Sequence, residues 1–136
     1  MPNETPSGFA DLGVPAALVN SLTARGIDAP FPIQTKTLPD TLAGRDVLGR
    51  GKTGSGKTLA FALPLVARLH GIRTAPNRPT GLVLAPTREL ATQITATVEP
   101  LARASGLTVT TIFGGVAQSR QVSALRAGAD IVVACP

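Results

Sequence analysis

The chain has 136 residues, of which 43% are hydrophobic and 15% are charged. This length suits one domain at roughly 100–200 residues per domain, and the apolar content excludes a largely disordered chain. The formal net charge is +5, from thirteen basic and eight acidic residues. Such an excess favours anionic partners such as nucleotides or nucleic acids, although a mildly basic surface with no special partner explains the charge equally well.

Several classes of protein are disfavoured by what the sequence lacks. Cys135 is the one cysteine, so no disulfide can form within the chain. The polar N-terminal residues do not resemble a secretory signal, and no apolar run approaches the ~18 residues of a membrane span. We therefore expect a cytoplasmic protein with no membrane partner. With only four Phe and no Trp or Tyr, any nucleic acid should be held by its backbone and not by stacked bases.

The first third of the chain is expected to be helical. Residues 1–8 should form a flexible leader, and residues 9–44 a separate helical segment. Within that segment, residues 15–25 carry leucines at helical spacing between a proline that suits a helix start and a glycine that suits a helix end. A second helix is expected over residues 33–42, with a kink or break at Pro39.

The remainder, residues 45–136, alternates apolar runs with amphipathic stretches. The expected strands are residues 46–49, 81–85, 107–113 and 130–134, and the expected helices are residues 57–70, 88–104 and 117–127. The strands are continuous apolar runs, which is typical of parallel strands buried on both faces. The sequence therefore predicts an α/β fold with helices on both faces of a parallel sheet.

A glycine-rich string between the first of these strands and its helix fits the phosphate-loop pattern G-x-x-x-x-G-K-[ST]. Its residues are Gly51, Lys52, Thr53, Gly54, Ser55, Gly56, Lys57 and Thr58. The glycines allow backbone N–H groups to point at phosphate oxygens, and the following helix adds its positive end. Lys57 is expected to reach the β- and γ-phosphates, and the Thr58 hydroxyl to bind Mg²⁺, so these two are the candidate catalytic residues. A glycine-rich surface turn is the weaker interpretation.

Hydrolysis of a triphosphate also requires a carboxylate at the carboxyl end of a strand, where it holds the metal. The last three expected strands are followed by Pro86, Gly114 and Cys135, and none has a carboxylate there. Asp46 and Asp130 lie at the opposite ends of their strands. We therefore expect the metal-binding carboxylate to lie beyond residue 136.

Several of these strings together resemble motifs of the DEAD-box RNA helicases. Residues 26–34, GIDAPFPIQ, resemble the Q motif, and Phe9 has the spacing of the isolated aromatic upstream of it. Residues 51–58 resemble motif I, and residues 86–91, PTRELA, are similar to motif Ia. The combination is far more specific than the phosphate loop alone.

Two further elements extend the resemblance toward the C-terminus. Gly114 and Gly115 resemble the GG element of the family, and Cys135-Pro136 falls where motif Ib would begin. The resemblance covers residues 9–136. It implies a RecA-like P-loop NTPase fold, represented here by an incomplete first domain that ends before the DEAD motif.

The resemblance implies roles for individual residues at the nucleotide. Gln34 would read the adenine edge, because its amide can donate and accept hydrogen bonds at once. Ile27 would pack on the adenine, in a place where the family usually has an aromatic. Phe9 would buttress the Q-motif loop, although an ordinary hydrophobic anchor for the leader explains Phe9 equally well. Gly51 replaces the more usual Ala at the start of motif I.

The resemblance also implies an RNA surface, on which glycines permit close approach of the RNA backbone. The residues that would hold RNA phosphates and sugars are Pro86, Thr87, Arg88, Gly114 and Gly115. Cys135 replaces a Thr of motif Ib, which would remove one hydroxyl contact to RNA.

The sequence therefore predicts part of an ATP-dependent RNA helicase, with ATP and Mg²⁺ as cofactors. RNA and a second RecA-like domain of the parent chain are the expected partners, and self-association through the open sheet is also expected. Residues 1–136 alone should bind ATP without turning it over, because they lack the metal carboxylate and the arginine finger. The alternative is the ATP-binding module of a DNA helicase or of another P-loop ATPase.

Overall fold

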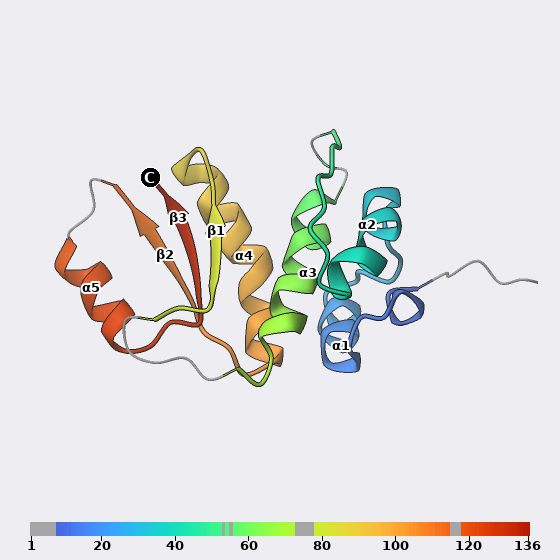
Figure 1. The fold of residues 1–136 in the computed structure, drawn as a ribbon, viewed down its shortest axis with the longest axis horizontal. Coiled ribbons are helices and arrows are strands. Elements are labelled where there is room, and N and C mark those ends of the chain that lie inside the picture. The colour runs from blue at the N-terminus through green and yellow to red at the C-terminus, as the bar shows by residue number, and fades with distance from the viewer. Residues whose placement is uncertain (1–7, 53, 55, 73–77, 115–117) are drawn as a thin grey trace, which may run out of the picture. The chain divides into compact units, whose positions relative to one another are not determined.

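A computed structural model describes residues 8–52, 54, 56–72, 78–114 and 118–136, the side chains of residues 118 and 119 excepted. The chain divides into two compact units, residues 1–68 and residues 69–136. This boundary lies later than the one expected after residue 44, because the loop after residue 44 and most of the following helix belong with the preceding helices. Figure 1 labels the elements of both units.

The first unit is helical. It contains a short 3₁₀ helix η1 (Ala10–Leu12), followed by α1 (Ala16–Ala24), α2 (Pro32–Leu42) and α3 (Lys57–Leu69), which continues one residue beyond the unit. The three α-helices expected here are confirmed to within one or two residues at each end. α2 continues through Pro39 without a break. The largest fully buried side chains of these elements are those of Leu18, Leu22, Leu38, Leu63 and Val66.

The strand expected at residues 46–49 is absent. Residues 45–50 form no helix or strand, and all are exposed, Leu48 to 95%. A strand needs a neighbour to satisfy its backbone, so a short apolar run predicts one only weakly. The hydrogen-bonded sheet of the described residues lies wholly in the second unit. The phosphate loop therefore follows an unpaired segment and not a strand.

The second unit is an α/β layer structure. Its elements are β1 (Gly81–Leu84), α4 (Arg88–Ala104), β2 (Val109–Phe113), α5 (Gln118–Arg126) and β3 (Ile131–Cys135). The three strands are parallel in the order β1-β3-β2, which confirms the expected parallel sheet. β3 lies in the centre and is almost entirely buried, which explains its uninterrupted apolar sequence.

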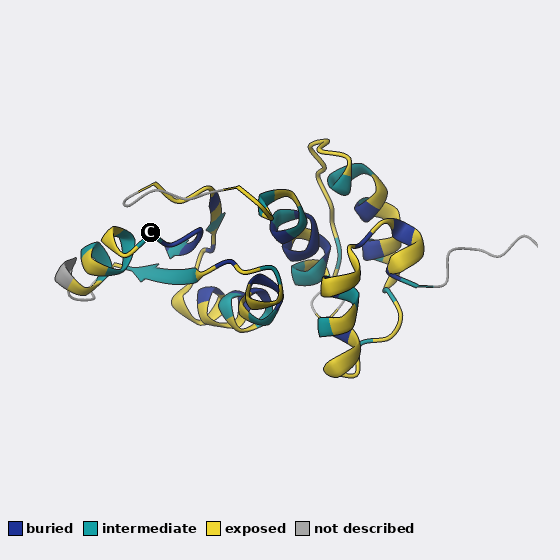
Figure 2. Ribbon diagram, turned by 90° about the horizontal axis from the view of Figure 1, so that it is seen from below, coloured by how far each residue is buried: buried dark blue, intermediate teal, exposed yellow. Residues whose placement is uncertain are grey.

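The strand order also dictates where the helices lie. The chain crosses from β1 to β2 in one direction and returns from β2 to β3 in the other. Because such crossovers are right-handed, α4 and α5 must cover opposite faces of the sheet, as Figure 1 shows. Figure 2 shows α4 with one buried side and one exposed side. The buried residues of α4 recur at helical spacing and are Ala91, Ile94, Val98, Leu101 and Ala102.

The amino ends and the carboxyl ends of these strands differ in the groups that lie there. At the amino ends of the strands, the Asp130 carboxylate is buried and accepts hydrogen bonds from the Thr108 N–H at 2.8 Å and the Thr108 hydroxyl at 3.1 Å. Thr108 and Asp130 immediately precede β2 and β3, so their hydrogen bonds join the starts of these two neighbouring strands. The carboxyl ends instead lead into the polar segments that the sequence assigned to RNA. No helix among the described residues is long and apolar enough to cross a membrane.

Candidate functional site

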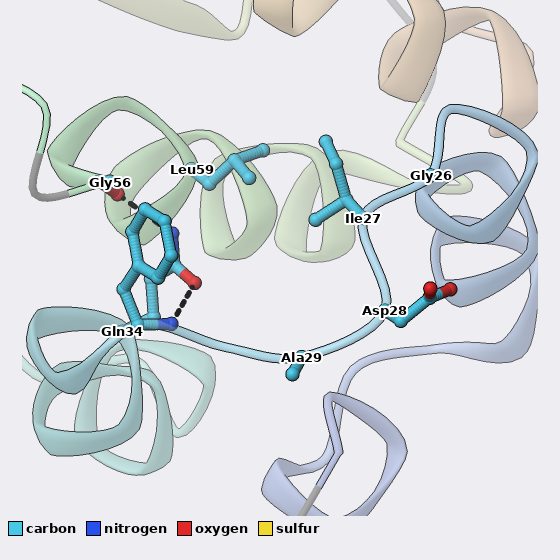
Figure 3. A pocket seen from close by; sticks show the side chains of 8 residues that line it. Gly26, Ile27, Asp28, Ala29, Gln34, Gly56 and Leu59 are labelled. Carbon is cyan, nitrogen blue, oxygen red and sulfur yellow. Dashed lines mark hydrogen bonds between the residues drawn. The ribbon is translucent and has the colours of Figure 1, made fainter.

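The first unit contains a hollow of about 360 Å³ between the loop before α2 and the start of α3 (Figure 3). Its lining residues come from the loop before α2, the first turn of α2 and the start of α3, and they are Gly26, Ile27, Asp28, Ala29, Phe31, Gln34, Gly56 and Leu59. The Q-motif string and the end of the phosphate loop therefore face one cavity. Gln34 and Gly56, which meet there, are 22 residues apart in the sequence.

Gln34 links these two segments directly. Gln34 is a buried polar residue, with 2% of its surface exposed. The side-chain Oε1 accepts a hydrogen bond from the Phe31 N–H at 2.9 Å, and Nε2 donates to the Gly56 carbonyl at 2.9 Å. The first bond caps α2, because a Gln three residues after the N-cap can reach back to the N-cap N–H. The amide keeps one N–H and one acceptor lone pair, which suit a ligand edge that both donates and accepts.

The glycines of the phosphate loop fall into two physical cases. Gly54 and Gly56 both have positive φ, at +81° and +85°, where an L-residue would be strained. An added Cβ at Gly54 would meet nothing within 4 Å. At Gly56 it would collide with the Gln34 amide nitrogen and lie 2.7 Å from Phe31 Cδ2. Gly56 is thus required by the packing of the pocket as well as by its backbone conformation.

Lys57 and Thr58 begin α3, with Lys57 exposed and Thr58 half-buried. The Ala60 N–H donates to the Gly56 carbonyl at 3.2 Å, which is a bond of the first turn of α3. A helix N-terminus and a lysine at one place suit an anionic phosphate chain. For Mg²⁺, Thr58 offers a single hard oxygen, and no cluster of three His, Cys, Asp or Glu occurs in the part of the chain that the structure describes.

The other residues assigned to the nucleotide are placed as follows. Ile27 lines the hollow, and its side chain points toward Leu59 on α3, whereas the Asp28 carboxylate points away (Figure 3). Phe9 is 2% exposed and does not line the hollow; its carbonyl accepts the N–H groups of Leu12 and Val14. The half-buried Gly51 and the exposed Lys52 are not lining residues either. The assignments of Thr53 and Ser55 lie outside the described residues.

Sequence reasoning missed one pocket residue of chemical interest. Phe31 is 51% exposed, lines the hollow and supplies aromatic surface that Ile27 does not. An aromatic between two prolines, immediately before a helix start, was the available signal. Leu59 was missed because it lies past the end of the phosphate-loop pattern.

The second unit presents a different region at the carboxyl ends of its strands. β1 leads into Pro86, Thr87 and Arg88, all of which are exposed at the start of α4. Thr87 caps this helix, because its hydroxyl oxygen accepts the Leu90 N–H at 3.1 Å. The hydroxyl proton of Thr87 stays available to a phosphate oxygen, next to the positive end of a long helix.

The neighbouring strand ends complete this region. Gly114 follows β2 and donates its N–H to the Cys135 carbonyl of β3 at 3.3 Å. The Arg88 guanidinium lies over the Phe113 ring, with 4.9 Å between its central carbon and the ring centroid. The structure therefore brings Thr87, Arg88 and Gly114 to one edge of the sheet, whereas Gly115 lies outside the described residues.

A parallel α/β sheet of this kind, accompanied by a glycine loop at a helix start and a hollow with a donor–acceptor amide, defines a P-loop nucleotide-binding protein of RecA type. Residues 31–136 match the family model described as DEAD/DEAH box helicase. The chain belongs to the DEAD/DEAH box helicase family. The resemblance expected from the Q motif, motif I and motif Ia is thereby confirmed, and so is the expected fold class.

Known relatives agree with this assignment. The chain is 44% identical to the ATP-dependent RNA helicase RhlB of Sodalis glossinidius (strain morsitans), over 95% of this chain and 32% of that protein. It is 42% identical to the DEAD-box ATP-dependent RNA helicase 24 of Oryza sativa subsp. japonica, over 94% of this chain and 17% of that protein.

A solved structure covers the whole chain. The crystal structure of the RNA-helicase Prp28 from Chaetomium thermophilum bound to ADP matches with a TM-score of 0.86 at 40% identity, covering 100% of this chain and 33% of that chain. The chain thus spans about a third or less of the length of these relatives.

Proposed function

We propose that this chain binds ATP and RNA as part of an ATP-dependent RNA helicase. The observation that carries the proposal is the Gln34 side chain, which joins the Q-motif helix to the phosphate-loop carbonyl of Gly56 in one hollow. Membership of the helicase family, the names of the relatives and the ADP in the Prp28 structure support it.

The chain's own residues have separable tasks at the nucleotide. Gln34 would present its remaining donor and acceptor to the adenine edge, between the apolar Ile27 and the aromatic Phe31. Lys57 and the N-terminal N–H groups of α3 would hold the phosphates. Thr58 would hold Mg²⁺, which when bound neutralises charge on the phosphates, and the nucleotide itself would supply further oxygen ligands.

Turnover needs groups that the described residues do not place at the site. The segments after β1, β2 and β3 carry no carboxylate at the edge where a metal-bound water would be held. We propose that binding resides in residues 1–136, and that hydrolysis and duplex separation depend on further sequence, including a second RecA-like domain. RNA-stimulated phosphate release by residues 1–136 alone would contradict this division of labour.

Titration of ATP into the chain by calorimetry tests the nucleotide site. Lys57→Ala removes a charge-assisted contact to phosphate, so affinity should fall by roughly 1.5–3 kcal/mol. Lys52→Ala is the matched control, because Lys52 is an exposed lysine of the same string that lies before the start of α3, and it should change affinity little. Equal effects of the two substitutions would refute the assignment of Lys57.

RNA binding is tested by its dependence on salt. Backbone contacts from Thr87, Arg88 and Gly114 should make the affinity for a single-stranded RNA fall by about 0.7 log units per contacted phosphate for each decade of salt. Fluorescence anisotropy with a labelled oligonucleotide measures this slope, and an affinity insensitive to salt would overturn the backbone-binding proposal. A DNA oligonucleotide of the same sequence separates an RNA helicase from the DNA-helicase alternative, because only RNA has 2′-hydroxyls.

We also propose that copies of this chain associate through β1. Among the described residues β1 pairs only with β3, and Leu82 and Leu84 on it are 62% and 64% exposed. An open strand with apolar side chains favours pairing with another chain. Sedimentation over a range of concentrations should show association that Leu82→Lys reduces, and a monomer at all concentrations would refute the proposal.

A further inference from the structure

We propose that Phe113 is a positioning residue for RNA binding, because its ring holds the Arg88 guanidinium beside Gly114 in the free protein. This inference rests on the proposed RNA role of residues 86–88 and names the residue that holds Arg88 in place. The two residues come from different elements, the start of α4 and the end of β2, and they meet at the carboxyl edge of the sheet.

The position of Arg88 in α4 is unfavourable for a cation without a stabilising contact. It is the first residue of α4, where the positive end of the helix makes a cation mildly unfavourable. Its guanidinium forms no salt bridge with any residue that the structure describes, although the chain has such pairs elsewhere, at Arg45–Asp40 and Arg103–Glu99. The contact that the structure gives its head group is the face of the Phe113 ring, 4.9 Å away. That distance lies within the range of a cation–π interaction.

Phe113 is itself held from two directions. It is the last residue of β2, in register with Cys135 of the central strand. Its backbone N–H donates to the Gln121 side-chain Oε1 of α5 at 2.7 Å. The ring is thus attached to a strand end whose backbone is held by both the sheet and a helix, independently of Arg88.

This arrangement prepares Arg88 for an anion. A guanidinium carries five N–H donors in its plane, so a ring that covers one face leaves donors at the edges free for phosphate oxygens. Next to the ring, Gly114 has open space where a side chain would lie. A long side chain already held in place loses less rotamer freedom when RNA binds, which raises affinity.

A double-mutant cycle on the full chain tests the inference, with a labelled single-stranded uridine oligonucleotide as the probe in fluorescence anisotropy. Phe113→Leu keeps an apolar side chain but removes the ring, and it should weaken binding roughly two- to five-fold, the equivalent of about 0.5–1 kcal/mol. Phe113→Tyr keeps the ring and should bind like the unaltered chain. In an Arg88→Ala background, Phe113→Leu should weaken binding no further.

The outcomes separate this inference from the function on which it rests. If Arg88→Ala weakens binding and Phe113→Leu does not, the positioning role is overturned and the RNA role stands. If Phe113→Leu weakens binding equally with and without Arg88, Phe113 acts through the fold alone, and the inference also fails. If neither substitution changes RNA affinity, or the chain binds no RNA, the RNA assignment itself fails and takes the inference with it.

A measurement without RNA checks the contact itself. The side-chain protons of Arg88 should show an upfield ring-current shift in the nuclear magnetic resonance spectrum, lost in Phe113→Leu and retained in Phe113→Tyr. Circular dichroism of each variant establishes that it is folded. Arg88 shifts that are the same in folded Phe113→Leu as in the unaltered chain would overturn the proposal independently of any RNA result.

Discussion

The two candidate sites of this chain are constructed in opposite ways. The hollow of the first unit depends on a buried amide, with Gln34 hydrogen-bonded on two sides and Gly56 packed against it. The site at the carboxyl ends of the strands in the second unit consists of exposed groups. Thr87 caps a helix, Arg88 lies over the Phe113 ring, and Gly114 has open space where a side chain would lie. The hollow is part of the packing of the first unit, whereas the second site lies on the surface of the sheet.

The difference suits the two ligands that we propose for these sites. A base is recognised by its edge and faces, which requires polar groups held at fixed positions in a partly dry pocket. An RNA backbone is a repeating anion, which requires exposed cations, N–H groups and room for approach. It follows that substitutions in the first site should damage stability and binding together, whereas those in the second should damage binding with little loss of stability.

Gly56→Ala should have the largest effect. The substitution combines strain at a positive φ with a collision against Gln34 and Phe31, and should cost about 2–5 kcal/mol of unfolding free energy. Gly54→Ala is the matched control, because it brings strain without a collision, and should cost about 1–2 kcal/mol. Urea denaturation measures both, and a Gly54→Ala variant as unstable as Gly56→Ala would show that packing at Gly56 contributes nothing.

Gln34→Ala should have the next largest effect, on two separable quantities. It removes the acceptor of the Phe31 N–H and one of the two hydrogen bonds to the Gly56 carbonyl, which should lower the unfolding free energy by about 1–3 kcal/mol. It should also weaken ATP more than GTP, because only adenine matches the amide. Melting without nucleotide and calorimetry with each nucleotide separate the two effects, and equal losses for ATP and GTP would contradict the adenine-reading role.

Thr87→Ala should have a smaller effect on stability. It removes the N-cap of α4, a change that typically costs about 1 kcal/mol. Thr87→Ser keeps the capping oxygen and should be close to neutral in denaturation. If Thr87→Ala lowered stability as much as Gly56→Ala, the two sites would not differ in the way described.

Gly114→Ala should have the smallest effect on stability and still matter for binding. An added Cβ there meets nothing within 4 Å, so the melting temperature should stay the same. The methyl group would nevertheless occupy space that an RNA backbone needs, so affinity for single-stranded RNA should fall. Unchanged RNA affinity in this variant would remove Gly114 from the proposed surface.

The sequence predicted most of the fold because its local patterns agree with the three-dimensional structure. The run at residues 130–134 matches the central strand β3, which is apolar because it is buried on both faces. The run at residues 81–85 matches β1, which is equally apolar although Leu82 and Leu84 are exposed. The run at residues 46–49 has similar composition but no hydrogen-bonded neighbour, and composition carries no information about neighbours. The strand order could not be predicted from local patterns, because it depends on pairings between residues far apart in the sequence.

At the candidate sites, the motifs predicted which residues take part better than they predicted the contacts between those residues. The Q-motif string indicated Gln34 as a ligand for adenine, but it did not indicate the bond from Nε2 to the Gly56 carbonyl, which needs the turn of the chain between them. Phe31 and Leu59 were recognised as pocket residues only in the structure. Phe31 lies within the Q-motif string but had no role assigned to it, and Leu59 lies past the end of the phosphate-loop pattern. Arg88 was expected at the RNA surface, whereas its partner Phe113 had been assigned only to a strand.

The central place of β3 has a consequence for how the second unit forms. Within the described residues, β1 and β2 share no ladder and each pairs with β3, which is synthesised after both of them. On the ribosome, the two earlier strands therefore wait unpaired until residues 131–135 emerge and insert between them. Sheet formation is then a single late step between segments distant in sequence, which slows folding and prolongs the interval in which chaperones or other chains can capture the apolar strands.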